Sequence, residues 1–158
     1  MTALWSILFG LVLLALAIAL FWRPARTFGR EVQVGRAREL FQLQREKLEH
    51  QFQATAAESG KPRGLRWKQC RFEPFLQLAR DRNNGQLIGL VAVNIQFEAV
   101  EGGDMEGLPA VDNLRYASAV FIFARGQWTT EGKTVFNMNP REALTHFQNQ
   151  YEPVDGEH

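Results

Sequence analysis

The chain has 158 residues and a mass of 18.0 kDa, which is enough for one ordinary domain. Its 46% hydrophobic and 22% charged residues exclude a disordered chain, and its single cysteine excludes an intramolecular disulfide and a multi-cysteine metal site. The net charge of +1 excludes a strongly cationic nucleic-acid binder, so we expect no nucleic-acid partner.

An uncharged run opens the chain. Residues Ala3–Trp22 carry no charged side chain, and a helix of that length, at about 1.5 Å per residue, matches a hydrocarbon core about 30 Å thick. Trp5 and Trp22 lie at its ends, where indole rings prefer the headgroup level. The run predicts a single transmembrane helix within residues 1–22, with the lipid bilayer as a partner. The alternative is a cleaved signal peptide with its cleavage site at Ala17–Ala19.

Basic residues follow this run, and none precedes it. The positive-inside tendency therefore predicts a single-pass protein of the cell membrane with its soluble body in the cytoplasm. Residues 23–82 hold 14 Lys and Arg against seven Asp and Glu, whereas residues 83–158 hold four against ten. Two interpretations stay open: the basic residues only set the orientation, or they also bind anionic lipid headgroups. The membrane-proximal basic residues are Arg23, Arg26, Arg30, Arg36 and Arg38.

A long amphipathic helix is the next predicted element, after a basic linker at 23–33. From Val34 to Ala57 the apolar residues recur at spacings of three and four, which places them on one stripe. The span covers only about three heptads, which is short for a stable coiled coil. We therefore expect the stripe to cover a sheet and the soluble domain to be a monomer. The stripe comprises Val34, Ala37, Leu40, Phe41, Leu48, Phe52 and Ala56.

Extended segments fill the middle of the chain. The first runs from Leu65 to Arg80, and Pro74 within it indicates an edge position, a bulge or two short strands. Asn84-Gly85 predicts a hairpin turn before the clearest strand, Leu87–Ala99. Two further strands are predicted, at Leu114–Ala124 and Trp128–Phe136.

A short helix is predicted to close the domain. Asn139, Pro140 and Glu142 have the spacing of a capping box, and Ala143, Leu144, Phe147 and Tyr151 would form its apolar face. The expected fold is therefore α+β: a transmembrane helix, a long helix on a four-stranded antiparallel meander, and a short C-terminal helix. The globular domain would span 34–151, with a flexible tail at 152–158. In topology alone, this order resembles the cystatin-like and nuclear-transport-factor-2-like (NTF2-like) layout, in which a helix lies across a curved sheet.

Motifs for phosphate binding, catalysis or metal binding are weak in this sequence. The stretch from Gly126 to Thr134 ends in Gly-Lys-Thr like a phosphate-binding loop, but five residues separate its glycines instead of four, and a strand is predicted where that loop requires a helix. Cys70 has no nearby histidine, and the three histidines lack a metal-ligand spacing. We therefore expect no catalytic residue, no metal and no cofactor.

Two functions remain open on this sequence. The first is a membrane-anchored, non-catalytic interaction or assembly module with an unidentified protein partner. The second is a membrane-tethered domain that binds a ligand between helix and sheet, where a cavity would need convergent polar groups as well as apolar walls. The candidate pocket-lining residues for the second function are Phe41, Phe52, Trp128 and Phe147.

Overall fold

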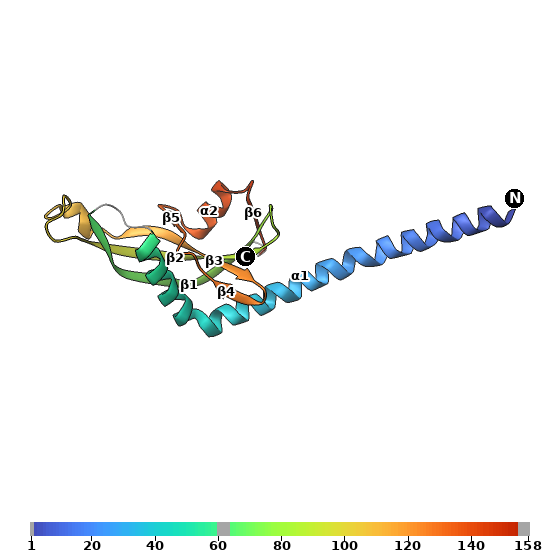
Figure 1. The fold of residues 1–158 in the computed structure, drawn as a ribbon, viewed down its shortest axis with the longest axis horizontal. Coiled ribbons are helices and arrows are strands. Elements are labelled where there is room, and N and C mark those ends of the chain that lie inside the picture. The colour runs from blue at the N-terminus through green and yellow to red at the C-terminus, as the bar shows by residue number, and fades with distance from the viewer. Residues whose placement is uncertain (1, 60–63, 155–158) are drawn as a thin grey trace. The chain divides into compact units, whose positions relative to one another are not determined.

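The structure of the chain is a computed structural model that describes residues 2–59 and 64–154; the side chains at 2–9, 12, 15–30, 59, 110 and 112 lie outside the description. It is an α+β fold with one long helix, α1 (Thr2–Ser59), one short helix, α2 (Pro140–His146), and a 3-10 turn at Pro109–Asp112 (Figure 1). The six strands are β1 (Leu65–Asp81), β2 (Leu87–Ala99), β3 (Arg115–Ala124), β4 (Gln127–Thr129), β5 (Thr134–Phe136) and β6 (Tyr151–Pro153).

The chain divides into two compact units, Met1–Arg36 and Ala37–His158. In the first, the described residues form only the N-terminal part of α1. The second contains the remainder of α1, the sheet and α2.

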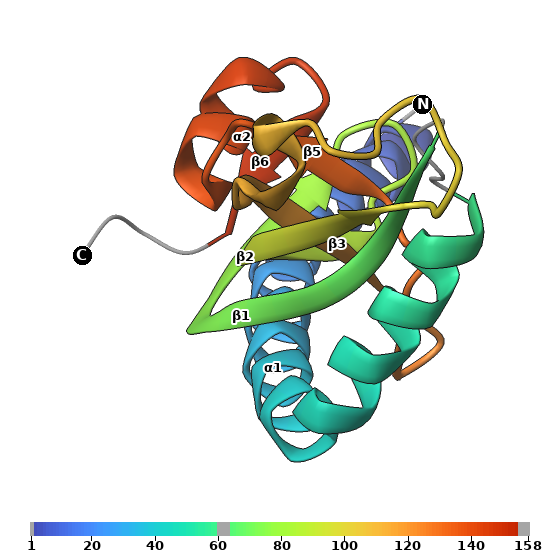
Figure 2. The same ribbon diagram turned by 90° about the vertical axis from the view of Figure 1, so that its left-hand side faces the viewer.

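All strand pairs are antiparallel, in the order β4-β3-β2-β1-β6. The short strand β5 pairs with β3 at Ala117–Ala119, and β4 pairs with the same strand at Ile122–Ala124. Residues from Ala37 onward in α1 lie on one face of this sheet, and α2 lies on the other (Figure 2). The sheet therefore separates two apolar clusters.

Aromatic rings fill the space between α1 and the sheet. The Phe41 ring meets Phe121 and Trp128 edge-on, with centroids 5.1 and 5.2 Å apart. About three turns of helix further on, the Phe52 ring lies 5.7 Å from the rings of both Phe72 and Phe121. The predicted stripe of α1 thus packs on the sheet, and burial of its rings is the main driving force for that contact.

The second apolar cluster lies under α2. Side chains on the α2 face of the sheet form this cluster together with α2, because successive strand residues point to opposite faces of the sheet. The α2 capping box is present as the sequence predicts: the Asn139 side chain accepts from the Glu142 N–H, and the Glu142 carboxylate accepts from the Asn139 N–H. The cluster comprises Ala79, Ile88, Leu90, Ala143, Leu144 and Tyr151, with Val135, Met138 and Phe147 at its border.

The predicted order of a transmembrane helix, a linker and a second helix is wrong for the backbone. One helix runs from Thr2 to Ser59 through the linker at 23–33 and through Pro24. A proline inside a helix removes one hydrogen bond and costs about 3 kcal/mol, which long helical runs on both sides can offset. Among the residues that the structure describes, no helix is long and apolar enough to cross a membrane; the span predicted at 1–22 falls mostly on side chains outside that description.

The prediction of a four-stranded meander is also wrong, because the sheet has six strands. The strand predicted at Trp128–Phe136 is two short strands, β4 and β5, separated by Thr130–Lys133. Tyr151, predicted on the short helix, instead begins β6, which pairs with the end of β1. Two of the three alternatives for Pro74 are present: it lies in a bulge of one continuous strand, and among the described strands the outer side of β1 pairs only at Ala79–Asp81, so Pro74 is also at an edge.

Candidate interaction surface

Three of the four aromatic residues predicted to line a pocket lie together on one side of the sheet, and the fourth, Phe147, does not. Phe41 and Phe52 are fully buried and Trp128 is 4% exposed, and all three pack between α1 and the sheet. The Trp128 Nε1–H donates to the Ala37 carbonyl oxygen at 2.7 Å, which fixes the indole against the helix. Phe147 lies on the other face of the sheet, beside the α2 cluster.

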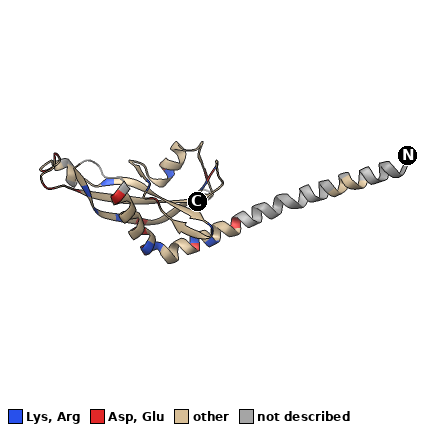
Figure 3. Cartoon of the chain, viewed as in Figure 1, with Lys and Arg blue, Asp and Glu red and all other residues tan. Residues whose placement is uncertain are grey.

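The predicted basic residues are described only in part. The side chains of Arg23, Arg26 and Arg30 lie outside the described residues, and Arg36 and Arg38 are exposed. Along the described part of α1, acidic and basic residues are interspersed instead of forming one basic face (Figure 3). The orientation, the cellular location and the binding of anionic headgroups stay predictions.

The Gly-Lys-Thr stretch has a structural explanation. Gly132 has a φ of +70° and lies against the backbone of α1 at Ala56. Lys133 donates from Nζ to the Tyr151 hydroxyl at 3.3 Å, and β5 follows it, as the sequence predicts for a strand in place of a phosphate-binding helix. Among the described residues, no group of three or more His, Cys, Asp and Glu side chains could hold a metal ion.

The bulge in β1 is the most distinctive feature of the sheet. Phe72 pairs with Val93 and Leu76 pairs with Val91, so three residues of β1 lie opposite the single residue Ala92. Pro74 lies at the centre of these three and has no N–H to donate to the ladder. The strand therefore needs another interaction to hold its shape here.

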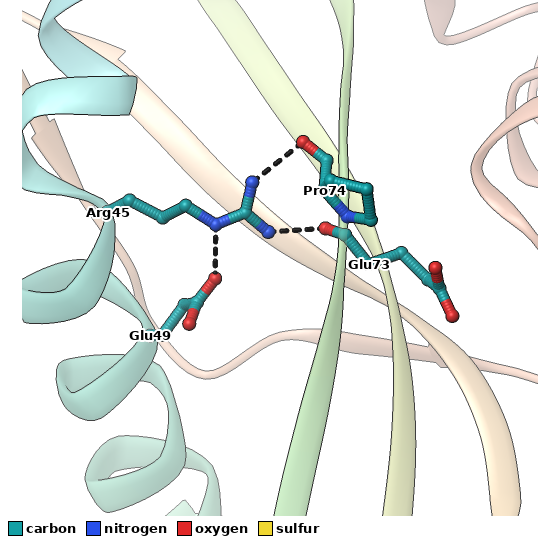
Figure 4. Close-up of polar contacts among 4 residues, drawn as sticks. All are labelled: Arg45, Glu49, Glu73 and Pro74. Atoms are coloured by element: carbon teal, nitrogen blue, oxygen red, sulfur yellow. Dashed lines mark hydrogen bonds and ion pairs between the residues drawn. The ribbon is translucent and has the colours of Figure 1, made fainter.

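Arg45 on α1 supplies that interaction. Its Nη1 donates to the Pro74 carbonyl oxygen at 2.7 Å, and its Nη2 donates to the Glu73 carbonyl oxygen (Figure 4). Its Nε donates to Glu49 Oε1 at 2.6 Å, and both side chains of this ion pair are mostly shielded, at 19% and 25% exposed. The planar fork of a guanidinium suits two neighbouring acceptors, so Arg45 fixes the bulge to the helix.

The bulge holds Phe75 out in solvent. The Phe75 side chain is 82% exposed, although it lies in a strand whose neighbours Leu76 and Leu78 are buried. It borders a groove of about 520 Å³ on the α2 side of the sheet, next to the start of α2. We call this the bulge groove; its lining includes Glu73, Phe75, Tyr116, Asn139, Pro140 and Arg141.

Tyr116 is the second aromatic side chain of the bulge groove and is 38% exposed. Partial burial, and after it the carboxylates of Glu142 and Glu73, raise the pKa of its phenol above the usual 10.0. The phenol therefore stays neutral at physiological pH and can donate or accept a hydrogen bond.

Polar side chains continue the open sheet face beyond the bulge groove. Gln69 pairs with Gln96 and Arg71 pairs with Asn94 across β1 and β2, and these four residues line a neighbouring hollow of about 380 Å³. Asn94 also pairs with Tyr116 across β2 and β3, which places the hollow next to the bulge groove. The part of this face that α2 leaves uncovered thus joins an aromatic patch to a polar one.

A second groove lies between α1 and β4, with Leu48 and Trp128 among its lining residues. It has a volume of about 410 Å³, and amide and hydroxyl groups dominate its walls, with Lys47 as its one charged lining residue. Such a surface is ordinarily well hydrated and offers little apolar area to a partner. The bulge groove, with two exposed aromatic rings, is therefore the stronger candidate.

Comparisons of the chain with protein-family models, curated proteins and solved structures gave no match. No sequence pattern identifies Arg45, Phe75 or Tyr116; the one signal in the sequence is Pro74, which interrupts a strand directly before a phenylalanine.

Cys70 provides a test of the packing at β1. It pairs with Ile95, and burial raises the pKa of its thiol from 9.0 to about 11. At about pH 8 the folded protein should therefore react slowly with a thiol reagent such as dithiobis-nitrobenzoate, and the unfolded chain should react fast, since only the thiolate is nucleophilic. Equal rates of thiol reaction in buffer and in denaturant would contradict the burial of Cys70.

The free energy of unfolding should fall as the pH rises from about 9 to 11, because the unfolded chain then loses the Cys70 proton that the folded chain keeps.

Proposed function

We propose that the domain formed by residues 37–158 is a non-catalytic protein-interaction module that binds its partner at the bulge groove. The supporting observation is Phe75, a phenylalanine that is 82% exposed and held there by an ordered bulge. Single exposed apolar residues are common on protein surfaces, but one beside a groove with a second aromatic ring is typical of an interface.

Rigidity is a second argument. Arg45 bonds to two carbonyl oxygens of the bulge, so the backbone that carries Phe75 is fixed before any partner arrives. A pre-organised aromatic side chain loses less conformational entropy on binding than one on a free loop. Large, rigid aromatic anchors of this kind often contribute most of the energy of an interface.

The alternative function, a ligand pocket between helix and sheet, has weaker support: the groove between α1 and β4 has Trp128 and several polar side chains in its lining, but not Phe41, Phe52 or Phe147. The rings of Phe41, Phe52 and Trp128 pack against neighbouring rings with centroids 5.1–5.7 Å apart, and they occupy the space that a ligand would need.

The test replaces Phe75 by the photo-crosslinker p-benzoyl-L-phenylalanine in the full chain, expressed in the cells that naturally make it. Irradiation should produce one discrete cross-linked product. The matched control places the same crosslinker at Leu43, which is also highly exposed, at 76%, but lies on α1 away from the groove lining. We expect no discrete product from position 43, and equal products at both positions would refute the proposal.

Phe75→Ala should then weaken binding of the cross-linked partner about tenfold or more, the usual effect of removing an aromatic anchor. Leu43→Ala should change it less than about twofold. Both variants should keep the melting temperature, because neither side chain is buried. Titration of the purified partner onto each variant measures the effect.

A further inference from the structure

The bulge groove is flanked by two carboxylates. Glu73 is exposed, and its side chain extends from β1 on the side away from Arg45 (Figure 4). Glu142 is exposed at the first turn of α2, where one of its oxygens accepts the Asn139 N–H. Glu73 lines the groove together with Tyr116, and the Asn139 N–H that donates to Glu142 belongs to another lining residue, so carboxylates from two elements border the groove. Both carboxylates raise the pKa of the Tyr116 phenol.

Cations also border the groove. Arg141 is one of its lining residues, and Arg71 lies two residues before Glu73 on β1; both are exposed. Arg45 lies on the other side of the bulge, bonded to Glu49 and to two carbonyl oxygens. The charges that perturb the Tyr116 phenol are Glu142 and Glu73.

This combination fits a cation. The face of an aromatic ring attracts ammonium and guanidinium groups, and neighbouring carboxylates strengthen that attraction and add hydrogen bonds. The exposed Phe75 ring offers an apolar contact directly beside it. From these features, and resting on the function proposed above, we propose that the bulge groove binds a segment of a partner protein through a Lys or Arg side chain placed over Tyr116, next to an apolar residue placed on Phe75.

Other occupants fit less well. An acidic segment or a nucleic-acid backbone would bring negative charge against Glu73 and Glu142. A second copy of the chain, joined by a two-fold axis through this groove, would bring the Glu73 and Glu142 carboxylates of both copies into one interface. Each of these arrangements adds negative charge beside Glu73 and Glu142.

The test is a selection of random heptapeptides, displayed on phage, on the immobilised full chain. The selected sequences should be enriched in Lys or Arg adjacent to an apolar residue, relative to a parallel selection on Phe75→Ala. Enrichment of acidic peptides, of peptides without a basic residue, or of nothing beyond the Phe75→Ala selection overturns the inference.

Substitutions then test whether the basic side chain of the peptide binds beside Glu73 and Glu142. The best selected peptide should bind at least about tenfold more weakly to the double variant Glu73→Gln, Glu142→Gln. The change Glu142→Gln keeps the capping box, because a glutamine side chain accepts the same hydrogen bond, so the double variant should fold normally. The control Glu101→Gln removes an exposed carboxylate in a distant loop and should change binding less than about twofold. Equal weakening by the control would mean that net charge, and not the groove, attracts the peptide, which overturns the inference.

The two proposals fail separately. If the crosslinker at position 75 captures a partner but the selection yields no basic peptides, the groove is an interface and the inferred chemistry is wrong. If position 75 captures nothing more than position 43, the proposed function itself is wrong.

Discussion

Phe52→Ala is expected to lower the free energy of unfolding by about 3–5 kcal/mol, the usual cost of deleting a buried phenylalanine ring. The Phe52 side chain is 0% exposed and contacts the rings of Trp67, Phe72 and Phe121, which come from two different strands. Removing it leaves a cavity whose walls belong to three elements, so the surroundings cannot easily collapse into it. Because the total stability of a domain this size is about 5–15 kcal/mol, the variant should be close to unfolding. Urea unfolding followed by circular dichroism measures the change.

Leu43→Ala on the same helix is the matched control for Phe52→Ala. Leu43 is 76% exposed, so its loss should change stability by less than about 0.5 kcal/mol while leaving the helix propensity almost unchanged. If Phe52→Ala costs no more than Leu43→Ala, the helix does not pack on the sheet as described. A helix seam between two chains would instead show as a dimer in sedimentation that the Phe52 variant loses.

Local patterns account for what the sequence predicts well. The stripe of α1 from Ala37 to Ala56 follows from the helical period alone, and the α2 cap follows from the spacing of Asn139 and Glu142. The strand at Leu87–Ala99 has the bounds that its apolar run and the preceding Asn-Gly turn indicate. Each of these signals depends only on residues that are close together in the sequence.

The errors arise where distant residues decide. Between Trp128 and Phe136 the composition is that of one strand, but the chain forms two short strands, and Gly132 in the segment between them lies against α1. Tyr151 fits the helical period after α2, yet it pairs with Asp81, a residue 70 positions earlier in the chain. Tertiary contact overrides local preference in both cases.

The candidate site is invisible to the same local patterns. Arg45, Phe75 and Tyr116 come from a helix and two strands and share no periodicity. In the sequence, Arg45 is one more charged residue on the polar face of a helix. Only the fold shows that its guanidinium bonds to Glu73 and Pro74, which lie 28 and 29 residues further along the chain. Pro74 indicated an irregular strand, but not that the irregularity would leave Phe75 exposed.

Gly132→Ala is the second substitution with a large expected effect. A Cβ at this position would lie 2.5 Å from the Ala56 backbone nitrogen and 2.7 Å from its Cα, and the φ of +70° is itself unfavourable for alanine. The atoms it meets belong to the backbone of α1, so no side-chain rotation can relieve the overlap. The loop between β4 and β5 must move away from the helix, and we expect a loss of about 2–5 kcal/mol, from the sum of backbone strain and overpacking.

Gly126→Ala separates these two contributions. Gly126 has a similar φ of +79°, but a Cβ there would meet nothing within 4 Å. It should therefore cost only the strain of the left-handed backbone, about 1 kcal/mol. The difference between the two variants, measured by urea unfolding of each, isolates the close approach of the loop to α1. If both variants lose the same stability, the glycine serves only its backbone conformation and the loop does not pack against Ala56. If Gly132→Ala loses more, the glycine of the Gly-Lys-Thr stretch is explained by packing against the helix, without any phosphate-binding role.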